Sequence, residues 1–321
     1  MQVRRGLAAA VAVALLVFAG EGALTQATRI IKIIVPYPAG GPGDILARLL
    51  GEQIAQEHGL TVVVENRPGA SGRIGTEAVA RLPPDGNSLL IVANNLLIDP
   101  HVRKVNYDPF ASFEPVCSLT DQAYIVVVNG SSPYRRLTDL LDAARALPGK
   151  LTMAGVGPAS TAQIAFEMLK RAANVDVTFV PYSGSAPAVT ALLGSHVSSA
   201  IVPHSVVAEQ LKSGHLRVIA TASDRRAEPL PDVPAFTESG FNNIDATLWI
   251  AVFAPARTPK ETLSELASWF IQALREPQVK AKLVHQGQFP VGMCGAEFSA
   301  HLRRQYDEYG RVIREANIKM D

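Results

Sequence analysis

The 321-residue sequence has only two cysteines, few aromatic residues and almost no net charge. Aromatic residues make up 6% of it, and 30 Lys and Arg stand against 29 Asp and Glu, a formal charge of +1. A chain with so little net charge does not indicate the basic surface that binding of DNA or RNA requires, so we expect no nucleic-acid partner. The seven histidines are scattered without ligand spacing and no C-x-x-C occurs, so we expect no metal site and no cofactor.

The two cysteines, Cys117 and Cys294, lie far apart in the sequence. A single pair gives no disulfide framework, so two buried reduced thiols are the favoured interpretation, and a disulfide stays open as the alternative for an exported protein. Neither cysteine is near the amino-terminal apolar segment. A lipid-anchored form is therefore not expected.

The apolar stretch at the amino end is too short to span a membrane. Leu7 to Ala19 has 13 residues, against the roughly 20 that a spanning helix needs. It follows the basic segment MQVRR and precedes small and polar residues, the pattern of a secretory signal peptide. We therefore predict a signal peptide over residues 1–27, with its exact cleavage site open, and an exported mature protein.

From Arg29 onward, apolar runs alternate regularly with amphipathic stretches. RIIKIIVPY has the composition of a buried strand, and apolar residues then recur at helical spacing between residues 45 and 54. This alternation is typical of an α/β fold in which a mainly parallel sheet is flanked by helices. The length suggests two domains, and no flexible linker divides the chain, so we predict two α/β lobes connected by strands.

The segment Pro38 to Asp44 carries glycines at 40, 41 and 43 between a predicted strand and a predicted helix that Asp44 would cap. The first amides of a helix lack internal partners and lie at the positive end of the helix dipole, so this loop suits a carboxylate or phosphate. An ordinary strand-to-helix turn is the structural alternative.

A second loop of this kind is AGVGPAST, Ala154 to Thr161, with Ser160 or Thr161 as the cap. Loops at the carboxyl ends of parallel strands line the crevice where α/β proteins bind ligands, so the two loops could face each other from two lobes. Ser71 offers a third cap, and Asn94 follows the third strand as a neutral donor, although turn chemistry accounts for such an asparagine equally well.

The sequence gives little support to an enzyme or to a cytoplasmic sensing domain. An exported hydrolase could use Ser71 or Ser160 as its nucleophile, but no G-x-S-x-G and no convincing base accompany them. Gly155, Gly157 and Ser160 match only half of a dinucleotide fingerprint. A cytoplasmic effector-sensing domain would share the architecture, but the predicted signal peptide argues against it.

The order of several long segments resembles the solute-binding receptors of tripartite tricarboxylate transporters, also called the Bug family. The resemblance covers the chain from about residue 30 to the end. The segments that carry it are VPYPAGGPGD, VVVENRPGASGRIGTEAVARLPPDG, YDPFASFEPV, PGKLTMAGVG, VPYSGSAPAVTALLG, LPDVPAFTESG and FAPARTPKE.

This resemblance implies a two-lobe periplasmic binding protein of the type II-like kind, with the ligand cleft between the lobes. Such a protein would capture a small organic carboxylate by hinge closure and deliver it to the membrane permease subunits of the transporter. It would be a periplasmic monomer and not an enzyme. A role as the ligand-presenting component for a membrane sensor kinase remains the alternative, because the sequence does not separate transport from sensing.

We expect lobe 1 over residues 28–126 plus 250–321 and lobe 2 over residues 127–249. Family members often carry His where this chain has Gln163 and Asp where it has Val202, which favours a more apolar or aromatic acid. From the loops and the resemblance together, the candidate ligand-binding residues are Tyr37, Ala39, Gly40, Gly41, Pro42, Gly43, Asp44, Ala70, Ser71, Gly72, Asn94, Gly155, Gly157, Ser160, Thr161, Gln163 and Tyr182.

Overall fold

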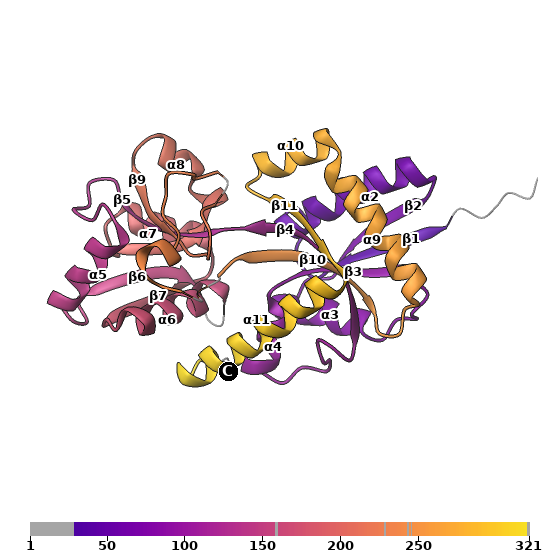
Figure 1. Ribbon diagram of the computed structural model, residues 1–321, viewed down its shortest axis with the longest axis horizontal. Helices are drawn as coiled ribbons and strands as arrows, with labels where there is room; N and C mark the ends of the chain where they lie inside the picture. The colour runs from indigo at the N-terminus through magenta and orange to yellow at the C-terminus, as the bar shows by residue number, and fades with distance from the viewer. Residues whose placement is uncertain (1–28, 158–159, 228, 243, 245, 320–321) are drawn as a thin grey trace, which may run out of the picture.

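A computed structural model describes residues 29–157, 160–227, 229–242, 244 and 246–319. The predicted signal peptide lies outside the described residues, as do positions 158 and 159 of the second predicted ligand loop. The chain forms two α/β lobes that lie side by side and are connected by strands (Figure 1). The predicted fold class is therefore confirmed.

Lobe 1 is built on a six-stranded sheet in the order β11-β4-β10-β3-β1-β2. The three strands β1, β2 and β3 are parallel, whereas β10, β4 and β11 join them in antiparallel pairs, so the sheet is mixed. The strand bounds are β1 Ile30–Val35, β2 Thr61–Asn66, β3 Ser88–Ala93, β4 Phe113–Gln122, β10 Leu248–Pro255 and β11 Phe289–Cys294.

Helices cover both faces of this sheet, which explains the continuous apolar run of β1. Ile33 and Val35 pack with α2, α9 and α10 on one face, and Ile34 packs with α3, α4 and α11 on the other. The helix bounds are α2 Pro42–His58, α3 Arg73–Val79, α4 Asn95–Val102, α9 Lys260–Arg275, α10 Pro277–His285 and α11 Gly295–Glu315, with a short 3₁₀ turn, η1, at Ala70–Gly72.

Lobe 2 repeats the plan with a five-stranded sheet in the order β7-β6-β8-β5-β9, in which β6, β7 and β8 are parallel. Its strands are β5 Tyr124–Asn129, β6 Leu151–Val156, β7 Val177–Tyr182, β8 Ser199–Pro203 and β9 Leu216–Thr221. Its helices are α5 Leu137–Ala146, α6 Thr161–Ala173, α7 Ser185–Leu193 and α8 Ala208–Lys212, with 3₁₀ turns η2 at His204–Val206 and η3 at Thr237–Ser239.

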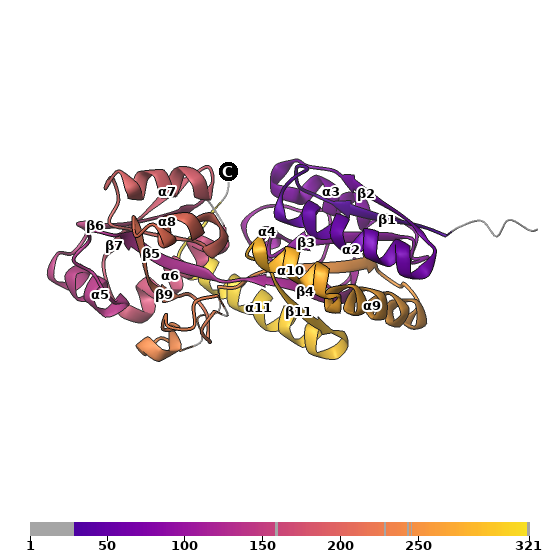
Figure 2. The ribbon, with the colours of Figure 1, turned by 90° about the horizontal axis from the view of Figure 1, so that it is seen from above.

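The chain crosses between the two sheets at Ala123, between β4 and β5, and again just before β10. These crossings lie a few residues before the predicted lobe boundaries, because an uninterrupted apolar strand pattern does not reveal where the pairing partners change. A third connection is α11, which starts on lobe 1 and ends against α6 of lobe 2 (Figure 2). There, Arg171 Nη1 lies 2.6 Å from Glu315 Oε2.

Cys117 and Cys294 form a disulfide, with Cα atoms 4.2 Å apart. The expectation of two reduced thiols was therefore wrong. The two residues are direct partners in the antiparallel pairing of β4 with β11, a contact between segments that are remote in sequence. Pairing of distant strands leaves no local sequence signal, so the bond could not be derived from cysteine spacing.

Candidate ligand-binding site

The first glycine loop leads into α2 as expected, but the helix begins earlier than predicted. Gly41 is the N-cap and Pro42 the first helical residue, so Asp44 lies within the first turn and not at the cap. Proline suits this position because its missing N–H would have no partner there. The buried Asp44 carboxylate reaches back into the loop, where its Oδ2 accepts the Gly40 amide at 2.9 Å.

Arg48 completes the environment of Asp44. Its Nε donates to Asp44 Oδ2 at 3.1 Å and its Nη2 lies 2.9 Å from Oδ1. Burial raises the pKa of Asp44, but the hydrogen bonds from Arg48 and Gly40 outweigh it and hold the pKa below its ordinary value. The start of α2 thus already contains one ionised carboxylate with its own counterion, and the Gly40 amide is committed to it.

Tyr37 joins the first loop to the second. A Cβ on Gly43 would lie 3.5 Å from one edge of its ring, and a Cβ on Gly72 would lie 3.0 Å from the other. The Tyr37 hydroxyl accepts the Ala93 amide at 3.2 Å, at the end of β3. One aromatic side chain therefore connects the carboxyl ends of three strands, and its pKa is raised by burial.

The second loop of lobe 1 has an unusual backbone. Gly69, Ala70, Ser71 and Gly72 all have positive φ, at 133°, 48°, 58° and 98°. Ala70 and Ser71 are exposed, and Gly72 is the N-cap of α3 without a side-chain cap, so Ser71 does not cap the helix as predicted. Strained backbone of this kind, held by its surroundings, is frequent at ligand sites.

Asn94 follows β3, as predicted, and its side chain makes hydrogen bonds within lobe 1 and to the segment before β10. Its Oδ1 accepts the Trp249 amide at 3.0 Å, and its Nδ2 donates to Thr247 O at 3.1 Å and to the Tyr309 hydroxyl at 2.7 Å. The side chain is fully buried. Its hydrogen-bonding groups thus hold α4, β10 and α11 together.

In lobe 2, Ser160 is the N-cap of α6, one of the two capping residues predicted. Its hydroxyl accepts the Gln163 amide at 3.2 Å and donates to Val156 O. Thr161 is buried at the first helical position and Gln163 is half-buried. The backbone amides of α6 that precede Gln163 have no hydrogen-bond partner within the helix.

The two glycines of this loop allow close packing with β7. A Cβ on Gly155 would lie 2.9 Å from the Phe179 ring, and a Cβ on Gly157 would lie 2.6 Å from Pro181. Gly157 also donates its amide to Tyr182 O at 3.3 Å. The structure therefore brings the loop after β6 and the half-buried Tyr182 together.

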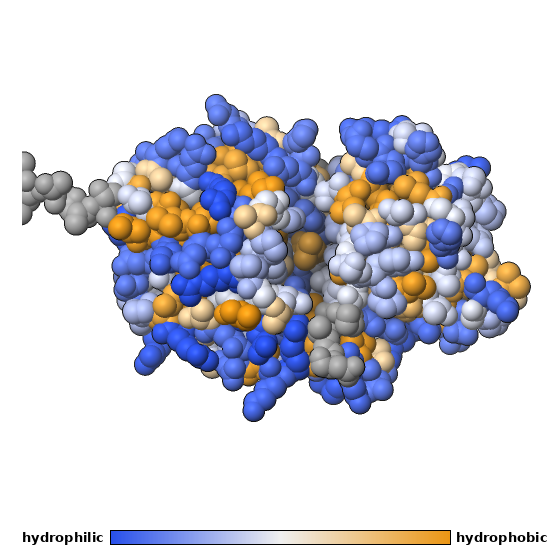
Figure 3. Space-filling model, turned by 180° about the vertical axis from the view of Figure 1, so that it is seen from behind, coloured by the Kyte–Doolittle hydropathy of each residue, from blue (hydrophilic) through white to orange (hydrophobic). Residues whose placement is uncertain are grey.

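The two groups of loops lie on the neighbouring sides of the two lobes. The carboxyl end of β1 and the start of α2 point from lobe 1 toward lobe 2, and the start of α6 points back toward lobe 1 (Figure 1). The molecule is hollowed between the lobes (Figure 3). Val202 does not contribute a polar group there, because it is fully buried in the core of lobe 2.

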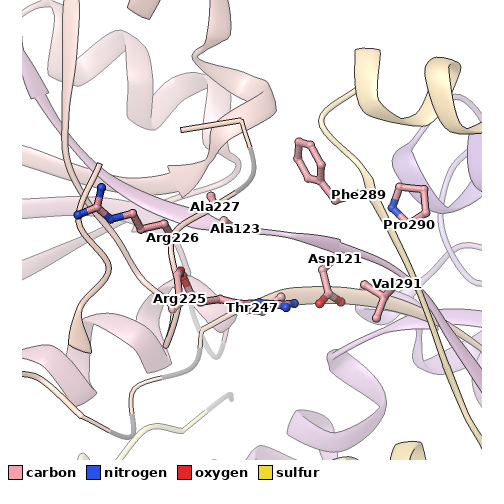
Figure 4. Close-up of a pocket in the computed structure, with 10 residues that line it drawn as sticks. Asp121, Ala123, Arg225, Arg226, Ala227, Thr247, Phe289, Pro290 and Val291 are labelled. Atoms are coloured by element: carbon pink, nitrogen blue, oxygen red, sulfur yellow. The ribbon is translucent and has the colours of Figure 1, made fainter. Parts of the chain in front are cut away.

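A separate cavity of about 350 Å³ lies at the hinge (Figure 4). Asp121 and Ala123 on the crossing strand, Arg225 and Arg226 from lobe 2, and Phe289 from lobe 1 line it. It contains none of the candidate residues, and the Arg226 guanidinium is committed to Glu238 at 2.8–3.1 Å. This cavity is therefore distinct from the predicted site at the glycine loops.

Sequence reasoning missed two side chains that support the first loop. Asn66, at the end of β2, donates to Tyr37 O at 3.1 Å, and Gln288, before β11, donates to Pro42 O at 3.2 Å. The position of Asn66 at a strand end was a usable signal. Gln288 had none, because it lies 246 residues from its partner.

The described residues contain neither a metal-binding cluster nor a membrane-spanning helix. No group of three or more His, Cys, Asp or Glu there could hold a metal ion. Within the same residues, no helix combines the length and the apolar character needed to cross a membrane.

Among curated proteins, the chain is similar to a UPF0065 protein from the tcbD-tcbE intergenic region of Pseudomonas sp. strain P51. The two are 33% identical over 293 residues, which cover 91% of this chain and 87% of the relative. Protein BugT of Bordetella pertussis is 31% identical over 299 residues, covering 92% of each chain.

Several solved structures of binding proteins are also similar to this chain. Periplasmic binding protein BugD matches with a TM-score of 0.73 and 30% identity, over 91% of this chain and 99% of BugD. R. palustris Rpa4515 with adipate matches with a TM-score of 0.76 and 29% identity, over 92% of this chain and 99% of Rpa4515. MatC of Rhodopseudomonas palustris with bound malate matches with a TM-score of 0.71 and 26% identity, over 89% of this chain and 99% of MatC. The family model described as tripartite tricarboxylate transporter family receptor matches residues 46–318, and the chain belongs to that family.

Proposed function

We propose that this protein captures a small organic carboxylate between its lobes, closes around it and delivers it to the permease of a tripartite tricarboxylate-type transporter. The observation that carries the proposal is the pair of helix starts, α2 and α6, on the neighbouring sides of the two lobes (Figure 1), with a hollow between the lobes (Figure 3). Each presents backbone amides at the positive end of a helix dipole. Family membership supports the assignment, and the mature protein would act as a periplasmic monomer.

The binding energy can come from the backbone. Micromolar affinity corresponds to about 8.2 kcal/mol, and a hydrogen bond to a charged group contributes roughly 1.5–3 kcal/mol. A few amides therefore suffice, even after the cost of ordering the ligand. Because the Asp44 carboxylate is neutralised by Arg48, it does not leave an uncompensated negative charge beside the bound acid.

We infer the ligand class from the lobe 2 residues that we predict to line the site. Gln163 and Tyr182 are neutral, and Val202 is buried in the core, so this lobe offers no acidic partner for an ammonium group at that position. We propose a carboxylate without such a group, and with an apolar or aromatic tail. The structural neighbours with adipate and malate make dicarboxylates the first compounds to test.

A binding panel tests the proposal. Purified protein is heated with adipate, malate, citrate, benzoate and glutamate, and a ligand of the native state raises the melting temperature by mass action. The acid that gives the largest shift is then titrated calorimetrically, and small-angle scattering is recorded with and without it. We expect stoichiometric binding and a smaller radius of gyration, whereas binding without compaction would contradict capture by closure.

The same purified protein, given esters of the panel acids, tests the hydrolase alternative. Ser160 is occupied as a helix cap, and Ser71 lies in an exposed turn, so neither hydroxyl has the environment of an activated nucleophile. We propose that the protein is not an enzyme. Release of a product from a carboxylate ester of the panel acids would contradict this. Delivery to a sensor kinase instead of a permease would leave the binding step unchanged.

A further inference from the structure

The turn that connects α10 to β11 is firmly held. The Gly287 amide donates to Val284 O and the Gln288 amide to Leu283 O, both at 2.9 Å, so the last turn of α10 fixes the backbone of the turn. Gly287 has φ +70°, a conformation that favours glycine. The turn therefore moves with α10 as one unit.

The Gln288 side chain connects this turn to the predicted ligand loop. It is almost completely buried, its Nε2 donates to Pro42 O at 3.2 Å, and its Oε1 accepts the Thr120 hydroxyl at 3.2 Å. Pro42 is the first residue of α2, and the fully buried Thr120 lies on β4 shortly before the crossing to lobe 2. One amide thus ties the start of α2 to a crossing strand.

The residue before Gln288 touches lobe 2. A Cβ on Gly287 would lie 2.6 Å from Ser205 Cβ and 3.1 Å from Ser205 Cα, so there is no room for a side chain. Ser205 belongs to η2, and its neighbour His204 donates its amide to Ala123 O at 3.3 Å, at the crossing itself. The turn therefore lies against lobe 2 at the hinge.

We propose that Gln288 is a positioning residue that couples lobe movement to the ligand loop of lobe 1. When lobe 2 rotates, η2 pushes or releases Gly287, and the adjacent Gln288 passes the displacement to Pro42 and the start of α2. The loop would thus reach its binding conformation together with closure. The proposal rests on the proposed function only in naming this loop as the ligand loop, and its tests need no ligand.

A steric wedge tests the contact with lobe 2. Gly287→Ala places a methyl group against Ser205, and Ser205→Gly removes the Cβ, the nearest atom that it meets. Gly292→Ala is the matched control, since Gly292 has a similar φ of +67° and a Cβ there would meet nothing within 4 Å. Spin labels on cysteines introduced at the exposed Ile74 of α3 and Leu193 of α7 report the separation of the lobes (Figure 2).

We expect Gly287→Ala to shift the distance between the labels to larger values, and the double variant with Ser205→Gly to return the distribution most of the way toward the original. The Gly292→Ala control should leave it unchanged. An unaltered distance distribution in Gly287→Ala would overturn the contact with lobe 2, because a methyl group cannot enter that space without displacing one side.

Hydrogen exchange of the amides in residues 37–45 tests the coupling. Gln288→Met keeps the size of the side chain but removes both hydrogen bonds, and should make exchange about fivefold faster, the factor that corresponds to about 1 kcal/mol. Thr120→Val removes one of the two hydrogen bonds without changing the shape of the side chain and should also make exchange faster. This second variant keeps the test valid if Gln288→Met fails to fold.

The decisive comparison combines the two changes. Gly287→Ala should alter exchange in residues 37–45 when Gln288 is present and have no further effect in the Gln288→Met background. An equal effect of the wedge in both backgrounds would show that the displacement reaches the loop by another route and would overturn the positioning role. Since no carboxylate is added, failure of the ligand panel leaves this result unaffected.

Discussion

The site depends most on residues that have little or no side chain. Gly40, Gly72 and Gly69 have positive φ, and Tyr37 fills the space that Gly72 and Gly43 leave. The glycine run was readable from the sequence because a turn into a helix needs such residues. The role of Asp44 could not be predicted from the sequence. Whether Asp44 caps α2 or accepts the Gly40 amide depends on where the helix starts, and Pro42 sets that start.

Gly40→Ala separates backbone strain from ligand binding. At φ +81° a side chain costs roughly 1–2 kcal/mol, and no atom lies within 4 Å of the added Cβ, so the variant should fold. Gly214→Ala, at φ +74° and equally free of contacts, is the matched control in lobe 2. We expect similar losses of melting temperature but weaker carboxylate binding only in Gly40→Ala. Equal affinities by calorimetry would contradict a ligand site at this loop.

At the scale of elements, β11 shows why part of the fold escaped prediction. The parallel units, such as β1-α2-β2, follow from local alternation of strand and helix patterns. The edge strand β11 instead pairs with β4, from which more than 160 residues separate it, and the disulfide between Cys117 and Cys294 fastens this pair. Because β11 continues from the Gly287 turn, the disulfide also stabilises the frame that carries Gln288.

Reduction of the disulfide should destabilise the protein measurably. A native disulfide contributes about 2–4 kcal/mol, which for a chain of this size corresponds to a fall of roughly 3–6 °C in melting temperature. Calorimetric unfolding with and without reductant measures the shift. The Cys117→Ala/Cys294→Ala variant should melt near the reduced protein and be insensitive to reductant. A reductant effect of the same size in that variant would exclude the disulfide as its cause.

At the scale of the whole molecule, the two lobes are connected by two crossing strands and by α11. In Figure 2, α11 lies on one side of the crossing strands, and α3 and α7 lie on the other side. The ends of α3 and α7 lie next to the gap between the lobes. A rotation that brings α3 and α7 together therefore separates α6 from the end of α11. A cavity of about 360 Å³, lined by Arg171 and Glu315 among other residues, borders this contact.

The ion pair between Arg171 on α6 and Glu315 on α11 should therefore favour the open form. Exposed pairs contribute about 0–1 kcal/mol, and a shift of that size toward the closed form raises apparent affinity by up to about fivefold. Calorimetric titration of Arg171→Ala with the acid found in the panel should show this increase, diminished at high salt by screening. Lys212→Ala, which breaks a pair with Glu209 inside lobe 2, should leave affinity unchanged. Weaker binding in Arg171→Ala would mean that this contact belongs to the closed form instead.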